Sequence, residues 1–135
     1  MNQLIAEAAK SAITDPSVTA EKGMCSRFGR QVTEKVYGEK FDHLFGATAL
    51  ETAKNFAQAG LARRVVHKAQ PMPGDFLFKN IGPNGHLGIY VGHGLVAENS
   101  STHLGRVCGA KGFRSLEAWG DISSIGCIHS IDTHA

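Results

Sequence analysis

Two residues that lie far apart in the sequence, Cys25 and His86, have the side chains that nucleophilic catalysis requires. A thiol attacks as its thiolate, which the unpaired N–H groups and the dipole at a helix N-terminus favour. Such a thiol also needs a base, and the base needs a partner that fixes its tautomer. The sequence predicts a helix that begins near Cys25, and His86 is the best candidate for the base.

The partner of His86 can be sought in the predicted β-hairpin over residues 86–99, because directly opposed residues of an antiparallel pair point to the same face. A three-residue loop over residues 92–94 would place Val91 opposite Leu95. Glu98 would then share a face with His86, close enough for a carboxylate to reach the imidazole. We therefore predict Glu98 as the residue that orients His86.

A hairpin loop of two or four residues would reverse this parity and place Asn99 on the face of His86 instead. The clean separation of the apolar residues onto the opposite face favours Glu98. Asn99 remains a candidate for contact with substrate. Tyr90, on the same strand face as His86, either lines the cleft as a second substrate-binding residue or packs against the sheet.

The elements that must position these groups follow from hydrophobic spacing. Periodicity predicts helices over residues 3–13, 25–37 and 45–59, a helical turn at 115–119, and strands at 75–79, 86–99 and 122–131. Helices come first and strands later, which indicates an α+β fold with N-terminal helices packed on a small antiparallel sheet. With 135 residues and 42% hydrophobic content, the chain suits a single domain, residues 1–135.

Composition excludes several classes of function. The formal net charge is +2 without a basic stripe, so we expect no nucleic-acid partner. The start of the sequence has no secretory signal pattern and no apolar run reaches 18 residues, so we expect synthesis in the cytoplasm and no membrane insertion. The three cysteines are odd in number and irregularly spaced, which indicates free thiols.

Several other reactive side chains receive structural interpretations. No Cys-x-x-Cys or His-Glu-x-x-His spacing is present, so we predict no metal and no cofactor. Asp75 follows Pro73-Gly74 and is interpreted as a turn residue that accepts from nearby N–H groups. Cys108 and Cys127 are interpreted as packing residues and Trp119 as a core residue.

Three blocks of the sequence together resemble a known family. "GMCSRFGRQV" at a helix start, "PMPGDFLF" leading into a strand, and "GHLGIYVGHGLVAENSS" are similar to the signature blocks of NlpC-type cysteine peptidases. These are papain-like enzymes of bacterial cell walls, and the CHAP amidases are close relatives. The resemblance implies Cys25 as nucleophile, His86 as base and Glu98 as third residue. The third residue is commonly His in the NlpC-type family, and Glu or Asn is more typical of the CHAP relatives.

The resemblance implies hydrolysis of an amide in peptidoglycan, either within the stem peptide or between sugar and peptide. The missing export signal is typical of phage lysins, virion-associated hydrolases and injected antibacterial effectors, which implies a phage virion or a secretion machinery as partner and action at the cell wall after delivery. Two alternatives stay open. The same thiol could act in a deamidase or an acyltransferase on another substrate, or the domain could be a non-catalytic part of a virion.

Overall fold

The computed structural model describes residues 1–21, 24–63, 65, 71–100 and 110–129. The helices are α1 (Gln3–Ala12), α2 (Cys25–Tyr37), the 3-10 turn η1 (Asp42–Leu44), α3 (Ala49–Gln58) and α4 (Leu116–Trp119). The strands are β1 (Ala62–Arg63), β2 (Phe76–Lys79), β3 (His86–Gly92), β4 (Leu95–Ser100), β5 (Ala110–Ser115) and β6 (Ser124–Gly126).

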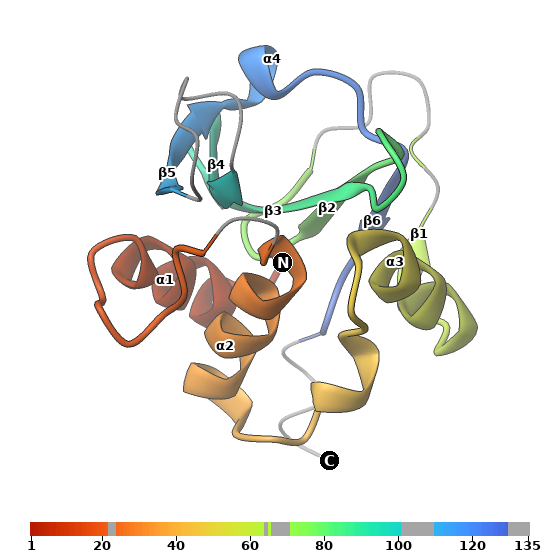
Figure 1. Ribbon diagram of the computed structural model, residues 1–135, viewed down its shortest axis with the longest axis horizontal. Helices are drawn as coiled ribbons and strands as arrows, with labels where there is room; N and C mark the ends of the chain where they lie inside the picture. The colour runs from red at the N-terminus through yellow and green to blue at the C-terminus, as the bar shows by residue number, and fades with distance from the viewer. Residues whose placement is uncertain (22–23, 64, 66–70, 101–109, 130–135) are drawn as a thin grey trace.

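All six of these strands form one antiparallel sheet in the order β1-β6-β2-β3-β4-β5. In Figure 1, α1, α2 and α3 lie on one side of the sheet and α4 lies on the other. The larger core lies on the three-helix side, and a smaller core around Trp119 lies under α4. The predicted α+β class is thereby confirmed.

The helix α2 packs against β3 unusually closely because of Gly29. A Cβ atom at this position would lie 3.0 Å from Cε1 of Phe45 and 3.1 Å from Cδ2 of Leu87. Glycine weakens a helix interior by about 1 kcal/mol relative to alanine. At this position the loss allows α2 to approach Phe45 and Leu87 closely. The helix ends at Gly38, whose φ of 63° is a left-handed conformation that favours glycine.

The third helix begins later than its hydrophobic spacing predicts. Thr48 is its N-cap, with the side-chain oxygen accepting from the backbone N–H of Glu51, so Phe45 precedes the helix in extended conformation. Helix N-caps favour Thr because its oxygen accepts one of the otherwise unpaired N–H groups. Phe45 instead joins a cluster of aromatic rings with Phe56 and Phe76.

The β3-β4 hairpin has a shorter loop than predicted. Gly92 pairs with Leu95, which leaves His93 and Gly94 as a two-residue turn with φ values of 53° and 73°. An irregularity between Tyr90 and Gly92 adds one residue to β3. The predicted pairing of Val91 with Leu95 is therefore wrong, and Leu95 is 39% exposed.

A two-residue turn without this bulge would have placed Asn99 on the face of His86. The extra residue in β3 returns Glu98 to that face. Ile89 pairs with Ala97, so Glu98 lies on the same face as His86, as predicted.

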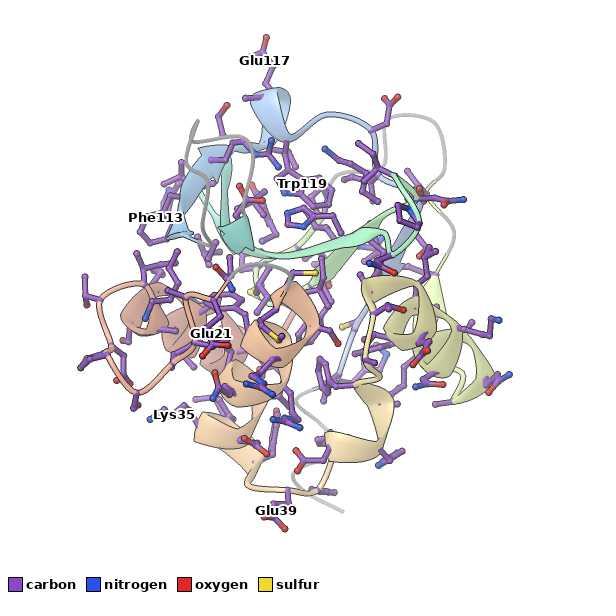
Figure 2. All side chains as sticks on the ribbon, in the orientation of Figure 1. Glu21, Lys35, Glu39, Phe113, Glu117 and Trp119 are labelled. Atoms are coloured by element: carbon purple, nitrogen blue, oxygen red, sulfur yellow. The ribbon has the colours of Figure 1, made fainter. Side chains whose placement is uncertain are left out.

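The sheet contains more strands than the sequence predicted. The strands β1 and β5 were not predicted. Within the predicted strand over 122–131, the described residues form only β6, and residues 130–131 lie outside the described residues. The predicted turn of helix at 115–119 is present as α4, with Ser115 accepting from the N–H of Ala118. Figure 2 shows Trp119 between α4 and the sheet, whereas Glu117 points away from the molecule.

Candidate active site

Cys25 is the first residue of α2 and its side chain is half-buried. The preceding residue, Met24, provides no side-chain cap for the helix. The first N–H groups of a helix have no partner within the helix, so they remain available to a negatively charged oxygen beside Cys25. Hydrophobic spacing at Met24, Phe28 and Val32 had predicted this start, and the structure confirms it.

His86, at the first position of β3, lies between Cys25 and Glu98. Its Nε2 atom is 2.7 Å from Oε1 of Glu98. The second ring nitrogen, Nδ1, is therefore the one left to face the thiol. Burial lowers the pKa of His86, but hydrogen bonds to Cys25 and Glu98, together with their negative charges, outweigh this effect and raise the pKa to about 9. The arrangement favours an imidazolium held between two acidic groups.

Glu98 is fully buried, and three neighbours compensate for the loss of water around its carboxylate. Besides His86, the indole Nε1 of Trp119 donates to Oε1 over 2.9 Å, and Nη2 of Arg114 donates to the same oxygen over 3.0 Å. Arg114 Nε also lies 2.9 Å from Oε2 of Glu98. A buried carboxylate is tolerated only when it is paired and hydrogen-bonded in this way, so the network fixes the position of Glu98.

Arg114 and Trp119 are site residues that sequence reasoning missed. Trp119 was predicted as core, and it is 1% exposed, but its N–H group also serves Glu98. Arg114 lies on β5, whose polar and glycine-containing sequence "AKGFRS" carries no alternating apolar pattern. A ring contact with His86 at 5.8 Å further ties Trp119 to the base. Only the pairing of β4 with β5 brings these residues to the site.

A cavity of about 440 Å³ opens beside Cys25 and His86. The start of α3 and the loop between β2 and β3 form much of its wall, and Lys79, Asn99 and Arg114 contribute the other polar side chains. Of the two predicted substrate-binding residues, Asn99 lines this cavity and Tyr90 does not. The hydroxyl of Tyr90 instead accepts from the N–H of Gly94 in the hairpin turn.

Asn99 connects two parts of the site. Its side-chain Nδ2 donates to the backbone oxygen of Glu21 over 2.9 Å, in the segment that leads to Cys25. Its Oδ1 atom is buried, and no hydrogen-bond partner for it is found among the described residues. Asn99 therefore ties strand β4 to the segment that precedes the nucleophile.

The other candidate residues have structural surroundings. Asp75 is buried, and its Oδ2 atom accepts from the N–H of Met72 and from Arg63, as a turn residue does. Burial and the nearby charge of Asp75 raise the pKa of Cys127 to about 11, which disfavours its thiolate. Cys108 lies outside the described residues.

The described residues offer neither a metal site nor a membrane span. No group of three or more His, Cys, Asp or Glu side chains in this part of the chain is arranged to hold a metal ion. In the same residues, no helix has the length and apolar character needed to cross a membrane.

The fold with this site places the chain in a defined structural class. The structure is similar to the NlpC/p60 domain of the peptidoglycan hydrolase SagA, with a TM-score of 0.60 and 22% sequence identity. The similarity covers 95% of this chain and 100% of that domain. The chain thus has an NlpC/p60 fold, as its three sequence blocks predicted. No family model matches the sequence, and no curated protein matches it.

Proposed function

We propose that this protein is a cysteine hydrolase that cleaves amide bonds in bacterial peptidoglycan. The observation that carries the proposal is the position of His86 between Cys25 and the buried Glu98, with Cys25 and His86 both lining a cavity. A thiol, an imidazole and a buried carboxylate in this order are the groups that acyl transfer needs. The NlpC/p60 fold is shared with a domain of a peptidoglycan hydrolase, which supports the choice of substrate.

In the proposed mechanism, the Cys25 sulfur attacks the amide carbonyl carbon and forms a tetrahedral intermediate. The imidazolium of His86 then gives its proton to the departing amine, and the carbon–nitrogen bond breaks. Water, deprotonated by His86, attacks the resulting thioester and releases the acid and the free thiol. Glu98 keeps the imidazole in the tautomer and orientation that both proton transfers require.

The start of α2 is suited to stabilise the negative charge that develops on the carbonyl oxygen. The backbone N–H of Cys25 and the following N–H groups are oriented by the helix before substrate arrives. Asn99 lines the same cavity, which supports its proposed role in contacting substrate.

The proposal is tested by incubating purified peptidoglycan with the wild type and with Cys25→Ala, followed by mass spectrometry of the released fragments. The matched control is Cys127→Ala, because burial disfavours the Cys127 thiolate and this residue lies outside the proposed site. We expect release by the wild type and by Cys127→Ala, and at least a thousandfold loss in Cys25→Ala and His86→Ala. The new amino and carboxyl ends identify the bond as a stem-peptide or a sugar-peptide amide.

Site-resolved labelling with iodoacetamide separates the remaining alternatives. We expect Cys25 to react faster than Cys127 because a thiolate is the reactive form. Rapid labelling of Cys25 with undigested peptidoglycan would point to acyl transfer on another substrate. Equal labelling of both cysteines without cleavage would contradict the enzyme proposal and favour a non-catalytic role. Delivery by a phage particle or a secretion machinery stays a prediction of the sequence.

A further inference from the structure

Besides His86, the cavity beside Cys25 contains two cationic side chains, and it has no acidic side chain among its described lining residues. Lys79 is directly opposite His86 in the β2-β3 register, so the two side chains lie on the same face of the sheet. Arg114 enters from β5 on the other side of Glu98. The positive charges therefore flank the proposed base rather than lying elsewhere on the surface.

Lys79 differs from Arg114 in having no carboxylate within ion-pair distance among the described residues. No ion pair of Lys79 is present within the described part of the chain, whereas Arg114 is paired with Glu98. The Lys79 ammonium donates to the backbone oxygen of Trp119 and lies 4.4 Å from the centre of its ring. Burial and the charge of Arg114 lower the pKa of Lys79, and the more weakly acting charges of Glu98 and Asp121 oppose this change. A half-buried ammonium held in this way has donor capacity left for an anion.

A second cavity, of about 350 Å³, is also lined by cationic side chains. It is lined by Met24 and Ser26, the neighbours of Cys25 in sequence, and shares Ala47 with the first cavity. Its charged lining residues are Arg27 and Arg30, and Nε of Arg30 lies 4.0 Å from a carboxylate oxygen of Glu34. Both cavities beside the nucleophile are thus cationic, which favours an anionic substrate.

We propose that Lys79 binds a carboxylate of the substrate in the cavity beside His86, so that the protein selects peptides carrying a free carboxylate near the amide it cleaves. Arg114 adds positive charge at this subsite while holding Glu98. This inference depends on the proposed function for its choice of probe, and it deepens that function by naming a specificity-determining residue.

The test measures binding without turnover. Isothermal titration of Cys25→Ala compares two probes, a stem peptide as the free acid and the same peptide with every carboxylate converted to carboxamide. A charge-assisted contact contributes about 1.5–3 kcal/mol, so we expect at least tenfold tighter binding of the acid. The comparison is repeated after adding Lys79→Met, Lys79→Arg or the control Lys54→Met, an exposed lysine on α3 outside both cavities.

We expect the preference for the acid to disappear with Lys79→Met and to persist with Lys79→Arg and Lys54→Met. Equal binding of both probes by Cys25→Ala, or an unchanged preference after Lys79→Met, would overturn the inference. If Lys79→Met does not fold, the titrations of Cys25→Ala and of Lys79→Arg still test the inference. Equal binding of both probes by Cys25→Ala would overturn it. Loss of the preference for the acid in Lys79→Arg would overturn it as well. Because binding is measured without hydrolysis, a failure of the peptidoglycan assay would count against the proposed function alone.

Discussion

Glu98 is the residue on which the proposed chemistry most depends after Cys25 and His86 themselves. Its carboxylate accepts from Trp119 and Arg114 while contacting His86, so its position is fixed from three directions. Its cationic neighbours Arg114 and His86 offset the cost of burying the carboxylate. A carboxylate fixed at Nε2 is what holds Nδ1 of His86 toward the thiol.

Replacement of Glu98 by Gln is expected to reduce the rate and to change its pH dependence. The imidazolium of His86 is the proton donor, so activity should fall as pH rises through about 9, the pKa to which Cys25 and Glu98 raise it. Glu98→Gln removes one of the raising charges, and the alkaline limb should move to lower pH. Rate profiles of kcat/KM against pH measure this displacement.

The control for this experiment is Glu117→Gln, because Glu117 is an exposed carboxylate that points away from the site (Figure 2). Its profile should coincide with that of the wild type. If Glu98→Gln keeps the wild-type rate and profile, the assignment of Glu98 as the residue that orients His86 is wrong.

At the scale of elements, the meeting of α2 with β3 decides how near the thiol comes to the imidazole. Cys25 begins the helix and His86 begins the strand, and their backbones approach through Gly29 and Leu87. The contact lies one turn beyond Cys25 on the helix. A wider separation of these two elements would move the nucleophile away from its base.

Substitution of Gly29 by Val is therefore expected to affect both stability and activity. The added side chain would start 3.0 Å from Phe45 and 3.1 Å from Leu87, and overpacking of this kind costs about 1–3 kcal/mol. Urea unfolding measures the loss, and the peptidoglycan assay measures the accompanying fall in rate.

Ala57→Val in α3 is the matched control, because Ala57 is exposed and the same residue is introduced into a helix. Its cost should be limited to the lower helix propensity of Val, below about 1 kcal/mol. Equal destabilisation by both variants would show that the close packing at Gly29 is not important.

At the scale of the whole molecule, the two faces of one sheet pack against two different hydrophobic cores. The site lies at the end of β3, where groups from both layers are within reach. The face with Leu87 and Ile89 packs against the three helices, and the opposite face with Val96 packs on Trp119. His86, at the end of β3, contacts groups from both layers, Cys25 on one side and Trp119 on the other. Folding of both layers is therefore needed to assemble the site.

This coupling predicts that the free energy of unfolding depends on pH through His86. Its pKa rises from 6.5 to about 9 on folding, so the native state binds more protons between these values. The stabilisation is complete below about pH 6.5 and is lost as pH rises through about 9, a change on the order of 3 kcal/mol. Urea unfolding of the wild type and of His86→Asn across this range measures it.

We expect the wild type to lose stability from pH 6.5 to 9 and His86→Asn to change little in the same interval. A parallel decline in both proteins would mean that His86 is not the titrating group. Above pH 9, Cys127, whose pKa is raised to about 11, should produce a further loss in both proteins.

The sequence by itself determined the local features. Helical spacing located the start of α2 and hence Cys25, and the two-residue alternation of a hairpin placed Glu98 with His86, because both patterns repeat over a few neighbouring residues. The loop length was wrong, and the register held only because a bulge in β3 compensated for it.

The tertiary structure alone decided what crosses between distant segments. Arg114 and Trp119 meet Glu98, and Lys79 enters the cavity, only through pairing of strands that are separated in the chain. Long-range pairing depends on which apolar faces can be buried together, and a polar strand such as β5 leaves no periodic trace of it. The network that holds the buried Glu98 carboxylate in place could therefore not be predicted from the sequence.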